Sequence, residues 1–93
     1  MKNINIIKIR RKLDKVDIKL LQVIKERSVL VDKIVGLKKN KNEVIDQKRI
    51  NFILKKIKKY SIENKIDAKI TTNIWKVMIK GFINYEFRKF KKK

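Results

Sequence analysis

The stretch IIKIRRKLDKVDIKLLQVIKERSVLVDKIVGL, residues 6–37, decides the fold of this 93-residue chain. Its apolar side chains recur in alternating steps of three and four, the heptad pattern of a helix that packs along one side. The positions on this side, called the apolar seam below, are Ile6, Ile9, Leu13, Val16, Leu20, Val23, Arg27, Leu30, Ile34 and Leu37. Such a helix would be about 50 Å long, which is too long for one small globule. We therefore predict that the seam packs against a partner, and a second copy of the chain is the simplest candidate.

One position of the apolar seam carries a charge. Arg27 stands there, although only five of the 28 basic residues in the chain are arginines. An arginine at a seam position can fix the helix register or extend its charged end to water. It can also bind a carboxylate through its planar, bidentate guanidinium, which a lysine cannot do. Because a charge among apolar side chains is costly without a counter-charge, Arg27 is a candidate ligand for an anion.

Two further helices follow a break at residues 40–45. Asp46 and Asp67 are each placed as N-caps before apolar residues at helical spacing. The second helix carries Ile50, Ile53, Leu54 and Ile57. The third is expected to bury a face that carries Ile70, Ile74, Trp75, Met78, Ile79, Phe82, Ile83 and Phe87. The sequence thus predicts an all-α fold with a very long first helix. We expect one domain over residues 1–93, with helices at about 5–39, 46–61 and 67–90.

Composition limits the chemistry of the chain. It has neither Cys nor His, so we expect no thiol or histidine nucleophile, no metal site and no cofactor. We find no hydrophobic run typical of a signal peptide or membrane span, and expect a cytoplasmic protein. The net charge of +19 first suggests a nucleic-acid partner. However, Ile, Lys and Asn supply 48 of the 93 residues, and the lysines occur in every segment, so compositional bias is the favoured explanation.

The spacing of three basic residues on the first helix indicates a site for a small anion. Arg27 and Lys38 are eleven residues apart, so about 16 Å of helix separates them, and both side chains could reach a molecule between them. Arg10 lies about 25 Å from Arg27 along the axis and a quarter-turn off its face. Arg10 could therefore contact that molecule only in a neighbouring subunit. Alternatively, Lys38 could merely complement the dipole at the helix C-terminus.

Three stretches resemble the all-helical bacterial chorismate mutases, which are the type II chorismate mutases. The first is Ile9-Arg10-x6-Asp17-x2-Leu20-Leu21-x4-Glu26-Arg27-x2-Leu30-x3-Ile34-x3-Lys38. The second is Val44-x-Asp46-x2-Arg49, and the third is Ile74-Trp75-x2-Met78-Ile79-x2-Phe82-Ile83-x2-Glu86. The stretches occur in order and cover nearly the whole chain. No single motif is specific, but their joint spacing is.

The resemblance implies an intertwined homodimer with two shared active sites and no cofactor. It implies an isomerase that converts chorismate to prephenate, the branch of the shikimate pathway toward phenylalanine and tyrosine. Arg27 would bind one substrate carboxylate, and Arg10 of the partner subunit would bind the other. Lys38 would donate to the ether oxygen whose bond breaks. Asp46 would help to bind the ring hydroxyl through its backbone N–H, and Ile34 and Ile79 would flank the ring.

Three positions depart from the family pattern. Glu86 stands where a Gln often donates to the ether oxygen, so it could help only when protonated, and we expect the rate to fall as it ionises. Ile50 replaces a Glu that meets the ring hydroxyl, and Phe82 replaces a small hydroxyl residue near the ring carboxylate. As pocket-lining residues, both would make the site more apolar. Arg49 would support the site, with a structural ion pair as the equal alternative.

Two other functions compete with chorismate mutase. Isochorismate pyruvate lyase resembles it in fold and in its basic residues, and the bulk of Phe82 keeps this alternative open. The second is a basic helical protein that binds nucleic acid, which predicts exposed aromatic residues on a basic face. Trp75, Phe82 and Phe52 instead fall on apolar helix faces and are expected in the core. The leading prediction is therefore a chorismate mutase.

Overall fold

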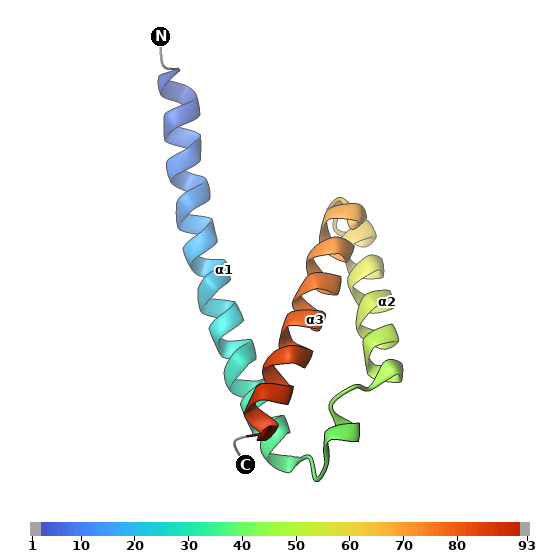
Figure 1. Cartoon of the computed structure of the whole chain (residues 1–93). Coiled ribbons are helices and arrows are strands. Elements are labelled where there is room, and N and C mark those ends of the chain that lie inside the picture. The colour runs from blue at the N-terminus through green and yellow to red at the C-terminus, as the bar shows by residue number, and fades with distance from the viewer. Residues whose placement is uncertain (1–2, 92–93) are drawn as a thin grey trace. The chain divides into compact units, whose positions relative to one another are not determined.

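The computed structural model describes residues 3–91, and this part of the chain forms three α-helices and no strand (Figure 1). Helix α1 comprises Ile4–Leu37, α2 comprises Gln47–Glu63, and α3 comprises Ala68–Lys91. A one-turn 3-10 helix, η1, lies at Lys41–Glu43 within the predicted break. The predicted all-α fold with a long first helix is confirmed.

Side-chain caps start the shorter helices where the sequence predicts. The Asp46 carboxylate accepts from the Arg49 backbone N–H at 3.0 Å, and the Asp67 carboxylate accepts from that of Lys69 at 2.9 Å. Each bond satisfies a backbone donor that the first helical turn leaves without a partner. Asn40 caps η1 in the same way, through a bond of 3.0 Å from the Asn42 N–H.

Helix α2 ends in a Schellman motif that contains a strained residue. The backbone N–H of Ile66 donates to the Ser61 carbonyl at 2.8 Å, and that of Lys65 donates to the Ile62 carbonyl at 3.4 Å. The motif requires a left-handed residue, and Lys65 takes this conformation with φ 57°. Glycine usually occupies such a position because it has no Cβ to clash with the following carbonyl.

The chain divides into two compact units at Leu30. The described part of the first unit is Asn3 and α1 as far as Leu30, and none of its residues is buried. The second unit begins at Val31 and contains the last turns of α1, η1, α2 and α3, with α2 packed along α3. Its buried side chains are Val35, Val44, Ser61, Ile79 and Glu86. The core therefore belongs to the second unit, whereas a lone helix has no core of its own.

Several apolar residues expected in the core are exposed. Phe52 is 55% exposed, and the Arg49 guanidinium covers its ring at 5.4 Å. Ile70 and Ile74 on α3 are also exposed, whereas Trp75 and Phe82 are half-buried. The core prediction for Phe52 and for these two isoleucines is thus wrong within the single chain. The reason is geometric, since a helix packed against one neighbour covers a stripe narrower than its whole apolar face.

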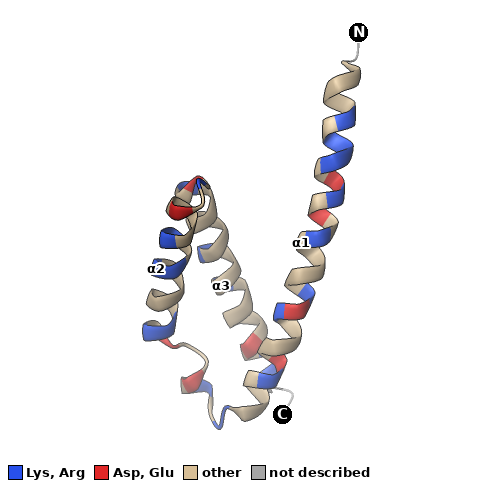
Figure 2. Ribbon diagram, turned by 180° about the vertical axis from the view of Figure 1, so that it is seen from behind, with Lys and Arg blue, Asp and Glu red and all other residues tan. Residues whose placement is uncertain are grey.

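Basic side chains are distributed along the helices. Figure 2 shows Lys and Arg along both α1 and α2, interrupted by other residues. This distribution agrees with the lysines being spread through every segment. None of the helices in the described residues is both long and apolar enough to cross a membrane.

Candidate active site

Lys38 and Glu86 form an ion pair between the end of α1 and α3. Lys38 directly follows Leu37, the last residue of α1, and its Nζ donates to Glu86 Oε1 at 3.0 Å. The two side chains are only 18% and 11% exposed. An ion pair with so little exposure is weakly screened by water and has a defined geometry. The structure thus brings together the two residues predicted to act on the ether oxygen.

An open groove of about 440 Å³ joins Lys38 to the start of α2. Its lining residues are Lys38, Glu43, Ile45, Asp46, Gln47 and Lys48. Since Asp46 is the N-cap of α2, the groove lies at a helix N-terminus, where backbone N–H groups and the helix dipole favour negative charge. Two of the predicted site residues, Lys38 and Asp46, therefore share one groove.

The two apolar departures from the family pattern lie in the second unit but do not line this groove. Phe82 is half-buried one turn before Glu86 on α3, and its ring meets that of Tyr85 edge to face at 6.2 Å. Ile50 is half-buried in the first turns of α2. Their predicted contact with substrate stays a prediction. Of the two residues expected to flank the ring, Ile79 is buried and Ile34 is 49% exposed.

The three predicted arginines differ in their surroundings. Arg49 is exposed near the start of α2, where its guanidinium lies over Phe52. Arg10 and Arg27 lie on the part of α1 that belongs to the first unit. Arg10 is exposed and borders a shallow groove with Asn3, Ile6 and Ile7, whereas Arg27 is half-buried. Binding of substrate by these arginines, and the entry of Arg10 into a second subunit's site, stay predictions.

A second polar contact, which the sequence does not predict, joins α1 to α3. The Tyr85 hydroxyl donates to Asp32 Oδ1 at 2.6 Å. This hydrogen bond, followed by partial burial and the negative charge of Asp32, raises the pKa of Tyr85 above its ordinary value of 10.0. The two residues are 53 positions apart, and neither belongs to a motif, so no local signal could pair them.

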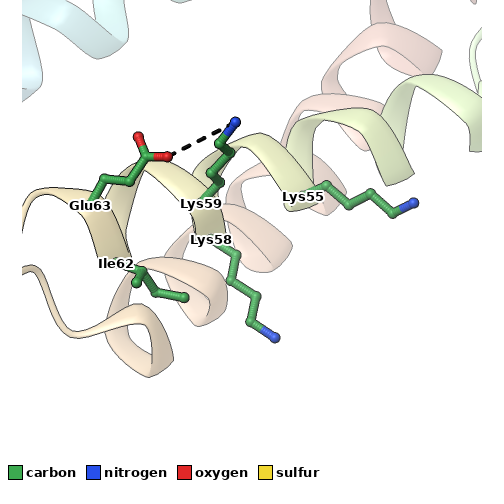
Figure 3. A pocket seen from close by; sticks show the side chains of 5 residues that line it. All are labelled: Lys55, Lys58, Lys59, Ile62 and Glu63. Atoms are coloured by element: carbon green, nitrogen blue, oxygen red, sulfur yellow. Dashed lines mark ion pairs between the residues drawn. The ribbon is translucent and has the colours of Figure 1, made fainter.

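Another groove lies on α2 and contains none of the predicted site residues. Its lining residues are Lys55, Lys58, Lys59, Ile62 and Glu63 (Figure 3). Lys59 and Glu63 form an exposed ion pair at 3.9 Å, which contributes little to binding or stability. Within residues 3–91, no cluster of acidic side chains could hold a metal ion. Of the predicted site residues, Lys38 thus pairs with Glu86 and shares a groove with Asp46.

Comparison with known families decides how these residues are interpreted. The model of the family described as chorismate mutase type II matches residues 9–87. The chain belongs to this family. The match includes every predicted site residue, namely Arg10, Arg27, Lys38, Asp46, Arg49, Ile50, Phe82 and Glu86. No curated protein and no solved structure matches the chain. Membership of the type II chorismate mutase family supports chorismate mutase-type activity in general, and with it the isomerase class of enzyme.

Proposed function

We propose that the protein is a chorismate mutase that rearranges chorismate to prephenate in the synthesis of phenylalanine and tyrosine. The observation that carries the proposal is the family match from residue 9 to residue 87, which includes Arg10, Arg27, Lys38 and Glu86. The groove that Lys38 shares with Asp46 adds support, since it places a cation beside a helix N-terminus. Both features suit a small substrate with two carboxylates.

The rearrangement needs no nucleophile, because one bond breaks as another forms within the same molecule. Catalysis therefore depends on holding the two arms of the substrate together. Binding in this folded conformation removes the entropy loss that the free substrate would undergo before it reacts in solution. Arg27 and the partner subunit's Arg10 would each bind one carboxylate through paired hydrogen bonds. Lys38 would stabilise the negative charge that develops on the ether oxygen. A chain without Cys and His is suited to this chemistry.

Glu86 can serve both Lys38 and the substrate when it carries a proton. A protonated carboxyl group has an accepting oxygen and a donating O–H. Oε1 would then accept from Lys38, as it does at 3.0 Å, while the second oxygen donates to the ether oxygen. Glu86 that is ionised, as in the ion pair with Lys38, would orient Lys38 but would repel the developing charge. Turnover should therefore fall as Glu86 ionises, and the Glu86→Gln variant should have a flatter pH profile.

Substrate conversion is the direct test of the proposed activity. Purified protein is incubated separately with chorismate and with isochorismate, and the products are identified by chromatography. We expect prephenate from chorismate, with turnover abolished by Arg27→Ala and by Lys38→Ala. Lys59→Ala is a matched control, because Lys59 is an exposed lysine outside the site. Cleavage of isochorismate to pyruvate and salicylate, with no prephenate from chorismate, would reassign the protein to the lyase. Turnover of neither substrate would refute both activities.

The proposed active unit is a homodimer that buries the apolar seam of α1. The isolated chain leaves most of this seam open, with exposed fractions of 58% at Ile9, 55% at Leu13, 56% at Val16, 52% at Leu20 and 57% at Val23. A continuous apolar surface of this kind is typical of an interface between proteins. A second α1 offers the same spacing and could pack along it in a two-fold arrangement.

Mixed dimers can test whether the two subunits share each site. Arg10→Ala and Lys38→Ala chains, each inactive alone, are unfolded together and refolded. If Arg10 acts in the partner's site, half of the dimers are mixed and each contains one intact site, so about one quarter of native turnover returns. If Arg10 and Lys38 act within one chain, no activity returns. Refolding each variant alone measures the background.

A further inference from the structure

Two hydrogen bonds join the end of α1 to α3. Tyr85 donates to Asp32 at 2.6 Å, and Lys38 donates to Glu86 at 3.0 Å. Tyr85 and Glu86 are consecutive on α3, so their side chains leave the helix about 100° apart. Asp32 and Lys38 are separated by about 9 Å of rise along α1 and its continuation. A single bond would let α3 turn about its axis, whereas two bonds in different directions oppose both rotation and sliding.

The Tyr85 side chain is well placed to maintain this restraint. Its bond to Asp32 is short and has an ionised acceptor, which makes it stronger than a bond between neutral groups. The ring contacts Phe82 edge to face, and the cationic groups of Arg88 and Lys89 lie 5.8 and 5.6 Å from its centroid. These contacts limit the positions of the hydroxyl before it meets the carboxylate.

We propose that Asp32 and Tyr85 are positioning residues that hold α3 so that Glu86 stays within hydrogen-bond distance of Lys38. This inference rests on the proposed function, because it assigns the effect to the ether-oxygen site. Neither residue lines the groove beside Lys38, so neither is expected to bind substrate.

Turnover of chorismate by Tyr85→Phe tests the inference with the aromatic ring retained. We expect kcat to fall about 3- to 10-fold, the loss that corresponds to one hydrogen bond, with KM nearly unchanged. Asp32→Asn keeps an accepting oxygen and should lose less activity. Tyr60→Phe is the matched control, because Tyr60 is 60% exposed on α2 and should keep native kinetics. Thermal unfolding of each variant shows whether the folded fraction has changed.

A second set of variants separates positioning from general stabilisation. If Tyr85 acts through Glu86, Tyr85→Phe should have no further effect on the residual kcat of a Glu86→Ala chain. Equal fold-losses in the two backgrounds would overturn the inference, as would an unchanged kcat in Tyr85→Phe. Absence of turnover by the native chain would overturn the proposed function itself and this inference with it. If the native chain turns over chorismate and Tyr85→Phe leaves kcat unchanged, the inference alone is overturned.

The contact can also be measured without any substrate. In a Tyr60→Phe chain, Tyr85 is the remaining tyrosine, so the ultraviolet absorbance of tyrosinate reports its titration. Asp32 raises the pKa of Tyr85 through its hydrogen bond and its charge, and Lys89 lowers this pKa. Asp32→Asn should therefore shift the titration to lower pH, with Arg88 and Lys89 unaltered. An unshifted titration would show that the two side chains do not interact and would overturn the inference.

Discussion

Replacing Lys38 by methionine removes the cation of the Lys38–Glu86 pair while keeping most of the length of the side chain. The Glu86 side chain is only 11% exposed and would lose its ammonium partner. Breaking a fully buried pair costs about 3–5 kcal/mol, whereas exposed pairs contribute at most about 1 kcal/mol. Because the side chains of the pair retain 18% and 11% exposure, we expect a loss of about 2–3 kcal/mol in unfolding free energy. Glu86→Gln keeps an oxygen that accepts from Lys38 and should cost no more than about 1 kcal/mol.

The double variant tests whether the loss comes from the unpaired carboxylate. Lys38→Met with Glu86→Gln leaves a neutral amide, so the two changes should be non-additive by about 1–3 kcal/mol. Urea unfolding followed by Trp75 fluorescence, at one fixed protein concentration, measures all four chains. Chorismate turnover should meanwhile fall about 100- to 1,000-fold in Lys38→Met, the usual effect of removing a donor to a developing charge. Additive stability changes, or a loss below about 0.5 kcal/mol, the usual size of surface effects, would refute the reasoning.

Three further changes test other features of the chain. Lys65→Gly should raise the unfolding free energy by about 0.5–1 kcal/mol, because glycine adopts the left-handed conformation of Lys65 without strain. Urea unfolding measures this free energy, and an unchanged or lower value would contradict the prediction. Leu20→Glu should convert dimers to monomers in analytical ultracentrifugation, since it places a charge in the apolar seam; a dimer that persists would contradict the proposed interface. The raised pKa of Tyr85 means that its stabilising effect is complete below the unfolded pKa of about 10 and is lost as pH rises through the folded value. Tyr85→Phe should remove this part of the alkaline loss of stability, and identical alkaline profiles would contradict the assignment.

Much of the fold could be predicted because helices depend on local signals. The spacing of apolar residues and the capping residues predicted helices at about 5–39, 46–61 and 67–90. In the structure the helices are Ile4–Leu37, Gln47–Glu63 and Ala68–Lys91. The caps at Asp46 and Asp67 act within three residues, so the sequence nearby is sufficient to identify them. The left-handed Lys65 was not predictable in this way, because glycine or asparagine normally marks such a position.

The roles of the site residues stay predictions, but the contacts between some of them can be compared with what the sequence indicated. Joint spacing and family resemblance selected Lys38, Asp46 and Glu86, and the structure places Lys38 in contact with Glu86 and in one groove with Asp46. The bond between Asp32 and Tyr85 escaped prediction because it joins residues distant in the sequence. Phe52 was expected in the core but is exposed. Periodicity identifies the apolar face of a helix, but it does not show which part of that face a neighbouring helix covers.

The sequence by itself determined the three helices, their starting residues and the pattern that marks a type II chorismate mutase. These properties follow from the helical period and from side chains that bond to the backbone a few residues away. Only the tertiary structure decided that Glu86 meets Lys38 while its neighbour Tyr85 meets Asp32. Consecutive side chains on a helix point about 100° apart, so which of them reaches another helix depends on how the two helices pack, and local spacing carries no information about that.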